Sequence, residues 1–283
     1  MKRVIVTADD FGLAVPVNEA VERAHREGVL TAASLMVGAA AAADAVERAR
    51  RLPGLHVGLH VVLVQGRPVL PPERVPDLVD ERGAFSDRLV RAGLSWFFRP
   101  RVRRQLADEI RAQFAAFRST GLPLDHVNAH NHMHLHPTLL ALVVAAGREH
   151  GLRAVRVPYE PPWASYRAAG SGLARRLATA AGLAPWIALL RWRLRRAGLK
   201  SNRYVFGLHD SGNMSAELVV RLAGELPAGV TEIYFHPATG SCAELDRQMP
   251  GYHHQAELAA LISPGVGDAL RAAGARRIAF GDL

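Results

Sequence analysis

Acidic and imidazole side chains recur directly after short apolar runs in this sequence. Five of them stand at the ends of four separate runs: Asp9, Asp10, His60, His130 and His236. Carboxylates and imidazoles are common ligands of divalent metals, and three ligands from separate strands leave positions open for water and substrate. Of two adjacent carboxylates, one can hold the cation while the other accepts a proton from water. The pattern therefore predicts metal-assisted hydrolysis.

Each of these residues also has a simpler explanation when taken alone. Either aspartate could cap the helix expected near Val15. A histidine that ends the run Leu-His-Val-Gly-Leu-His60 is as often a packed core residue as a ligand, and His236 precedes a proline that makes a turn signal. The agreement of four strand ends is stronger evidence than any single residue.

The segment from His126 to His136 holds five histidines in eleven residues, all of them at even-numbered positions. In an extended strand these rings would share one face. Because one metal needs only one or two imidazoles, we expect one ligand here, one or two histidines that line the pocket or orient ligands, and ordinary packing for the rest.

The elements that would position these residues follow from the alternation of apolar runs with amphipathic stretches of helical length. We expect strands near residues 3–8, 32–37, 55–62, 124–129, 153–157, 203–206, 230–235 and 276–280. We expect helices over 15–27, 40–51, 102–119, 137–150, 216–226, 255–261 and 266–273. This order predicts an α/β fold with a distorted or incomplete (β/α) barrel of mostly parallel strands, one strand of which could be missing. In such a barrel the polar strand ends gather at one rim.

The length and composition suit a single domain over residues 1–283, because 49% of the residues are hydrophobic and no linker stands out. Cys242 is the only cysteine, so no intramolecular disulfide can form. The chain opens Met1-Lys2-Arg3 and enters an apolar strand at once, which is too short for a signal peptide. The expected compartment is therefore the cytoplasm.

The net charge of +9 is concentrated in a basic aromatic insertion around residues 161–200. Nine basic residues and no acidic one lie between Pro161 and His209, interleaved with tryptophan and leucine. A helix expected over 185–197, and a second basic aromatic stretch at 94–104, would suit peripheral contact with an anionic membrane. Packing of these helices against the core, with solvated basic faces, is an equal alternative. Nucleic acid is not expected as a partner.

Several motifs together resemble the YdjC-like carbohydrate deacetylases, also called the chitooligosaccharide deacetylase (ChbG-type) family. The motifs are Thr7-Ala-Asp-Asp-Phe-Gly-Leu13, His56-Val-Gly-Leu-His60, the block His126 to Pro137, Arg156-Val-Pro-Tyr-Glu160 and Glu232-Ile-Tyr-Phe-His236-Pro237. The resemblance spans nearly the whole chain. It implies a distorted (β/α) barrel that removes the acetyl group from an N-acetylated sugar with the help of one divalent metal ion.

The resemblance also implies roles for individual residues. Asp10, His60 and His130 would hold the metal, with zinc or magnesium expected. Asp9 would be the general base and His236 would protonate the departing amine.

Three further residues are candidate substrate contacts: His132, Arg156 and Glu160. For Arg156 and Glu160, a structural ion pair or packing at the barrel rim is an equal alternative.

Within the family, the segments Val127-Asn-Ala-His130 and Phe280-Gly-Asp-Leu283 look most like the hopanoid-biosynthesis-associated HpnK branch. This likeness implies an N-acetylglucosaminyl hopanoid as substrate. Deacetylation of soluble chitooligosaccharides, another metal-dependent hydrolysis and, more distantly, a non-catalytic membrane-surface protein remain alternatives.

Overall fold

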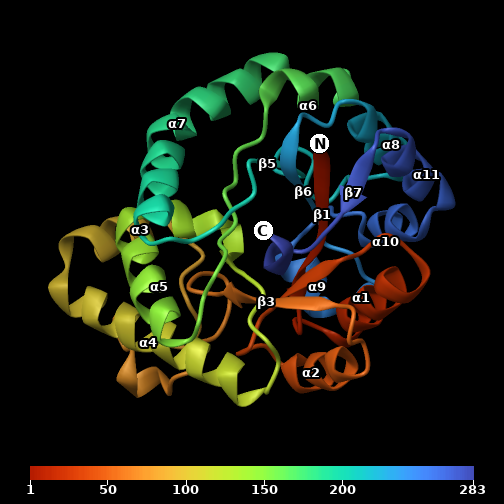
Figure 1. Ribbon diagram of the computed structural model, residues 1–283. Helices are drawn as coiled ribbons and strands as arrows, with labels where there is room; N and C mark the ends of the chain where they lie inside the picture. The colour runs from red at the N-terminus through yellow and green to blue at the C-terminus, as the bar shows by residue number, and fades with distance from the viewer.

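Seven parallel strands form the centre of the computed structural model, which describes all residues from 1 to 283 (Figure 1). The strands are β1 (Lys2–Phe11), β2 (Ala32–Leu35), β3 (His56–Val61), β4 (Val127–Ala129), β5 (Tyr204–Phe206), β6 (Gly229–Phe235) and β7 (Ala275–Arg277). Their order is β4-β3-β2-β1-β6-β5, and β7 pairs with the first residues of β1. β1 lies between β2 and β6 in the curled sheet and is buried from Val4 onward.

Eleven helices surround the strands (Figure 1). They are α1 (Val15–Glu27), α2 (Ala42–Arg50), α3 (Leu89–Phe98), α4 (Pro100–Ser119), α5 (Pro137–Glu149), α6 (Pro162–Ala169), α7 (Leu173–Arg196), α8 (Ala216–Gly224), α9 (Ala243–Gln248), α10 (His254–Ile262) and α11 (Pro264–Ala272). The seven helices expected from periodicity are all present, within two residues at each end. The short helices α6 and α9 carried too little apolar periodicity to be predicted.

Local chemistry sets the bounds of α1. Pro16 stands at the start of the helix, where its missing N–H costs nothing. Gly28 ends it, and a Cβ atom there would lie 2.1 Å from the carbonyl oxygen of Leu261 in α10. Only glycine therefore allows α1 and α10 to approach this closely.

The barrel is incomplete, as predicted, and the irregularity lies between β4 and β5. The strand expected at 153–157 is not regular; Ala154 and Val155 make only isolated parallel bridges, to Lys200 and Val127 respectively. Pro158 and Pro161 follow directly and cannot donate ladder hydrogen bonds. An extended segment thus spans the gap that a full strand would fill.

The basic aromatic insertion contains α6 and α7. The helix expected over 185–197 is the second half of α7, which begins at Leu173 and carries Pro185 inside it. Figure 1 shows α7 arching over the edge of the barrel, in keeping with the missing hydrogen bond at an internal proline. α7 is long and apolar enough to cross a membrane by length and composition, but it packs on the barrel through Ile187, Leu190 and Leu194.

The second basic aromatic stretch, at 94–104, is divided between two helices. α3 ends at Phe98 and α4 begins at Pro100, with the backbone of Arg99 extended between them. Proline disfavours helical backbone in the residue before it, which explains the break.

Candidate active site

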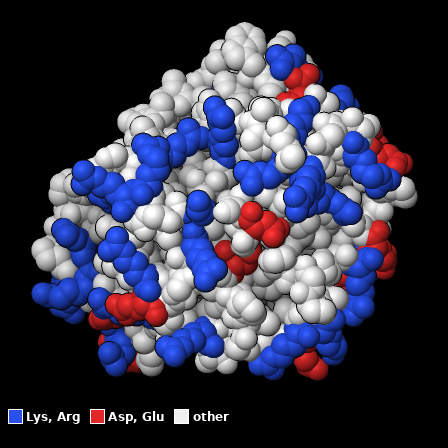
Figure 2. All heavy atoms as spheres, viewed as in Figure 1, with Lys and Arg blue, Asp and Glu red and all other residues white.

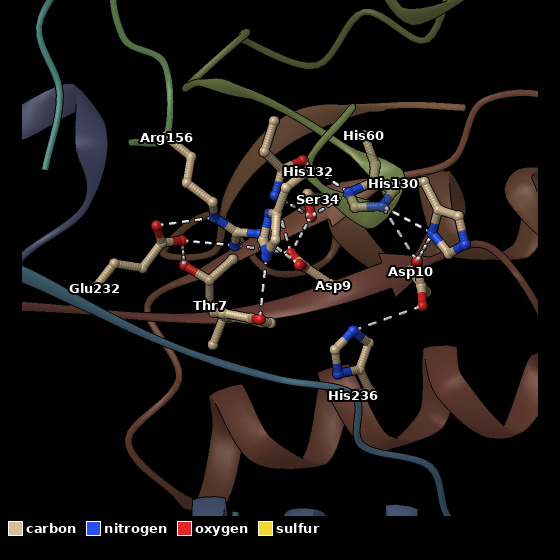
Figure 3. Close-up of polar contacts among 12 residues, drawn as sticks. Thr7, Asp9, Asp10, Ser34, His60, His130, His132, Arg156, Glu232 and His236 are labelled. Carbon is tan, nitrogen blue, oxygen red and sulfur yellow. Dashed lines mark hydrogen bonds and ion pairs between the residues drawn. The ribbon is translucent and has the colours of Figure 1, made fainter. Parts of the chain in front are cut away.

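The C-terminal ends of β1, β3, β4 and β6 bring the five predicted residues together (Figure 3). Asp9 and Asp10 lie near the end of β1, His60 lies in β3, His130 directly follows β4 and His236 directly follows β6. The parallel register explains the meeting, because all these strands end at the same rim.

A bulge in β1 lets two neighbouring aspartates serve one site. Successive side chains of a regular strand point to opposite faces. The pairing of β1 with β2 shifts register between Ala8 and Phe11, and Asp10 adopts a left-handed backbone with φ 61°. This conformation is costly for a residue other than glycine and is typical of functional sites. It turns Asp10 toward the histidines while Asp9 faces the barrel interior.

Asp10, His60 and His130 form a buried cluster whose ligand atoms lie within 4.8 Å of one another. Asp10 Oδ1 is 3.3 Å from His60 Nε2 and 3.2 Å from His130 Nδ1. Asp10 Oδ2 is buried and has no hydrogen-bond partner. A buried carboxylate oxygen without a donor is costly unless a cation completes it, so the cluster fits a divalent metal.

The ring of His60 is fixed with its second nitrogen toward this cluster. Nδ1 donates to Asn128 Oδ1 at 2.7 Å, which leaves the lone pair of Nε2 free. Burial lowers the pKa of His60 to about 4, although the charges of Asp9 and Asp10 oppose the shift. His60 is therefore neutral at physiological pH, the state that binds a metal.

His130 differs from His60 in its charge balance. Burial alone would lower its pKa, but the Asp10 carboxylate beside it and Asp9 further away raise the pKa above the ordinary value. For Asp10 the same two effects have the opposite signs: burial raises its pKa, but the neighbouring imidazoles lower it to about 2. A proton on His130 thus competes directly with a metal ion at this cluster.

Four hydrogen bonds hold the Asp9 carboxylate (Figure 3). Arg156 donates from Nη1 to Asp9 Oδ2 at 2.5 Å and from Nη2 to Oδ1 at 2.9 Å. Ser34 and Asn128 donate to Oδ1 at 2.6 and 3.0 Å. Burial favours the neutral acid, but the charge and hydrogen bonds of Arg156 hold the pKa of Asp9 well below its usual range. Asp9 is therefore a permanent carboxylate.

Arg156 is itself held from the other side. Its Nε and Nη2 donate to Glu232 at 2.9 and 2.7 Å, and Thr7 donates to the same carboxylate at 2.8 Å. The Tyr234 ring lies 4.6 Å from the guanidinium carbon. Burial lowers the pKa of Arg156, but its two carboxylate partners raise it above the ordinary value. The guanidinium is a fixed cation at the barrel centre.

His236 faces the cluster from the opposite side. Its Nε2 lies 4.0 Å from Asp10 Oδ2, and its side chain is 13% exposed. The imidazole therefore directs Nε2 at the cluster while part of its ring stays accessible to solvent.

The structure also places the three candidate substrate contacts. Arg156 is fully buried and forms ion pairs with Asp9 and Glu232, as expected if it is structural and does not contact substrate. Glu160 likewise pairs with Arg176 at 2.9 Å and is buried. His132 is near the site, with Nε2 3.1 Å from Tyr234 Oη and with a buried, unpartnered Nδ1.

The five clustered histidines do not share one face, because most of their segment is not an extended strand. β4 ends at Ala129, and the following 3₁₀ turn contains two consecutive left-handed residues, Asn131 and His132. The rings therefore diverge. His134 Nε2 is hydrogen-bonded to the backbone carbonyl of Arg156 at 3.0 Å, while the ring of His136 packs on Trp96 outside the barrel.

Sequence reasoning missed the residues that orient the site. Ser34 and Asn128 contact both Asp9 and His60, and Glu232 anchors Arg156. Each is a buried polar side chain within a strand, which is costly without a partner. That contrast is the signal that could have found them.

The model of the YdjC-like protein family matches residues 3–272. This chain belongs to the YdjC-like family. A "Carbohydrate deacetylase" of Brevibacillus brevis is 40% identical over 164 residues, or 57% of this chain and 60% of that protein. Another, of Thermoanaerobacter pseudethanolicus, is 27% identical over 239 residues, or 84% of this chain and 82% of that protein.

The chain spans under two thirds of some of these relatives: 60% of the Brevibacillus protein and 63% of a Vibrio parahaemolyticus protein also named "Carbohydrate deacetylase". A solved structure covers more. The crystal structure of an Enterococcus faecalis protein, described as a candidate for cellobiose-phosphate cleavage, aligns with 100% of this YdjC-like chain and 98% of its own. The TM-score is 0.78 and the identity 25%.

Proposed function

We propose that this YdjC-like protein hydrolyses the acetamide of an N-acetylated sugar with the help of one divalent metal ion. The observation that carries the proposal is the pairing of a buried Asp10, His60 and His130 cluster with an ionised Asp9 and an opposed His236. The names of the relatives support the same reaction.

The residues of the chain divide the proton transfers between them. Asp9 accepts a proton from the attacking water as the new C–O bond forms, and Oδ2, whose one partner is Arg156, has a lone pair available. His236 Nε2 gives a proton to the nitrogen as the C–N bond breaks. The products are acetate and the free amine of the sugar.

The low pKa of Asp9 makes it a weak base, so its contribution depends on position as well as basicity. Arg156, Ser34 and Asn128 supply that position through four hydrogen bonds.

The bound metal would polarise the acetamide carbonyl and increase the acidity of water. A set of one carboxylate and two imidazoles favours zinc, while magnesium is the harder alternative. His60 and His130 would supply nitrogen, and Asp10 would supply oxygen.

A cavity of about 1080 Å³ is lined mainly by residues that follow β1, β2 and β3 and by none of the five site residues; it offers space for a substrate larger than one sugar. Its wall includes Leu13, three residues past Asp10, and Val62, two residues past His60. Gln65 lines it too and accepts a hydrogen bond from Asn131, the neighbour of His130. The volume of about 1080 Å³ lies just above the usual range for ligand sites, roughly 300–1,000 Å³.

We further propose that the sugar is carried on a hopanoid lipid, that the protein is cytoplasmic and that it contacts the inner membrane surface. Exposed aromatic rings support membrane contact: Trp163, Trp186 and Trp192 are 56%, 42% and 45% exposed, and Phe98 is 72% exposed. Figure 2 has the same view as Figure 1. In it, Lys and Arg side chains form a band across the part of the surface where Figure 1 shows α7. Aromatic rings beside arginines suit anionic headgroups.

The deciding experiment measures acetate release from an N-acetylglucosaminyl lipid and from di-N-acetylchitobiose. The metal-reconstituted wild type is compared with Asp9→Asn and His130→Ala. We expect release from the lipid, lost in both variants. Release from chitobiose alone would move the substrate to soluble sugars, and no release from either would contradict deacetylation.

Membrane contact is tested separately by pelleting with vesicles. Binding is expected with anionic lipid at low salt, with a decrease as salt rises. Absence of binding even at low salt would contradict the membrane proposal while leaving deacetylation intact.

A further inference from the structure

The loop between β5 and α8, residues 207–214, packs closely against the strand that carries His236. Gly207 and Gly212 have φ angles of 112° and 80°, in the left-handed region. A Cβ atom on Gly207 would lie 2.7 Å from the carbonyl oxygen of Tyr234, and one on Gly212 would lie 2.4 Å from the Tyr252 ring. The loop therefore has little freedom to move relative to His236.

Two buried carboxylates fix this loop through its backbone. Glu160 accepts from the Leu208 N–H at 2.8 Å at one end, and Glu257 accepts from the Met214 N–H at 3.1 Å at the other. Glu257 also accepts from the backbone N–H of His236 at 2.5 Å. One carboxylate thus holds both the loop and the segment that bears His236.

Ser211, in the middle of the loop, faces the imidazole. Its Oγ lies 3.4 Å from His236 Nδ1 and accepts a hydrogen bond from Tyr252 Oη at 3.1 Å. The ring of Tyr252 also meets the His236 ring edge-on at 5.3 Å. Asp10 is the only carboxylate within 4.0 Å of the ring nitrogens, and it lies on the side of Nε2.

We propose that Ser211 and Tyr252 are positioning residues that fix the tautomer and direction of His236; this inference rests on the proposed function. Ser211 Oγ has two lone pairs. It accepts one hydrogen bond from Tyr252 and one from the Nδ1–H of His236.

This arrangement keeps a proton on Nδ1 and makes Nε2 the nitrogen that exchanges its proton. When Nε2 passes its proton to the departing amine, the Nδ1–H bond to Ser211 persists, so the ring does not turn. Unlike a carboxylate, the hydroxyl orients the ring without adding a charge. The ring can then give up its proton without breaking an ion pair at Nδ1.

A double-mutant cycle tests the inference through acetate release. Ser211→Ala is expected to lower kcat about tenfold with KM nearly unchanged, and to cause no further loss in a His236→Ala background. Ser211→Thr, which retains the hydroxyl, is expected to restore most of kcat. Ser241→Ala is the matched control, because the Ser241 hydroxyl donates to Asp246 on the surface and does not contact His236.

The outcomes separate the inference from the function on which it rests. Equal losses from Ser211→Ala in both backgrounds would overturn the positioning role alone, because a structural defect acts whether or not His236 is present. If His236→Ala itself retains wild-type kcat, the acid role fails and the inference falls with it.

A measurement without turnover gives a second readout. Nitrogen-15 chemical shifts of the His236 ring report which nitrogen carries the proton. We expect protonated Nδ1 in the wild type and a mixture of tautomers in Ser211→Ala, with a smaller change in Tyr252→Phe. A wild-type ring protonated only at Nε2 would overturn the inference even if the enzyme is active.

Discussion

Asp9 and Asp10 are neighbours in the chain and equally buried, at 2% and 1% exposure, yet their surroundings are opposite. Asp9 receives four hydrogen bonds and a full countercharge from Arg156. Asp10 faces two imidazoles with one oxygen, and its other oxygen has no hydrogen-bond partner, with His236 Nε2 4.0 Å away. The comparison teaches that the surrounding groups decide the role of an aspartate. With a countercharge and hydrogen bonds from the protein it is a permanent anion, and with an oxygen left unpartnered it can bind a metal.

The largest expected effect separates these two roles. Asp9→Asn and Asp10→Asn should each lower kcat for acetate release by about 10²–10⁴-fold, the usual range for loss of an acid–base group. Only Asp10→Asn should also lose the metal, because Asp9 lies outside the ligand cluster. Metal content after dialysis, measured by emission spectroscopy, distinguishes them. Equal metal loss in both variants would erase the distinction.

The next effect concerns stability on the Asp9 side. Arg156→Met leaves Asp9 and Glu232 buried without their common cation, and should lower the free energy of unfolding by about 3–5 kcal/mol. The matched control is Arg23→Met. Its pair with Glu27 is about half exposed on both sides, and should contribute less than about 1 kcal/mol.

Urea unfolding measures both variants of this pair. Comparable losses would mean that the central network contributes no more than a surface ion pair. They would also remove the physical basis for treating Asp9 as rigidly fixed.

The sequence predicted the Asp10 side of this comparison better than the Asp9 side. Strand ends are visible as apolar runs, and parallel strands bring their C-terminal ends together, so Asp10, His60 and His130 could be placed at one rim. The confirmed helices and the incomplete barrel follow from the same periodicities.

The Asp9 network depends on contacts that no periodicity records. Ser34, Asn128 and Glu232 come from three different strands, and their meeting depends on register and on the bulge at Asp10. The left-handed turn at Asn131 and His132 was equally invisible, since neither residue type requires it. Tertiary packing, not local propensity, decides such positions.

A third prediction concerns pH and belongs to the Asp10 side alone. The raised pKa of His130 means that a proton occupies this ring below that pKa and must leave when metal binds. Affinity should therefore fall as pH falls, approaching about tenfold per unit below the pKa of His130. His60, with a pKa of about 4, and Asp10, with a pKa of about 2, add nothing between pH 5 and 8.

Calorimetric titration of the metal in buffers of different ionisation enthalpy counts the released protons. Near pH 6 we expect close to one proton per metal bound in the wild type. Asp9→Asn is the comparison variant, since Asp9 contributes less than Asp10 to the raised pKa of His130. Release of no proton by the wild type would contradict the assignment of His130 as a ligand.

The smallest expected effect lies where the two sides meet, at Ser34. Its hydroxyl donates to Asp9 Oδ1 at 2.6 Å and lies 3.2 Å from His60 Nδ1. Ser34→Ala should lower metal affinity about tenfold, the lower end for groups that orient ligands, and stability by about 1 kcal/mol. Asn128→Ala should cost more on both measures, because Asn128 is the nearer partner of His60 at 2.7 Å. If Ser34→Ala changed kcat without changing metal affinity, Ser34 would serve Asp9 alone, and the two carboxylates would act independently.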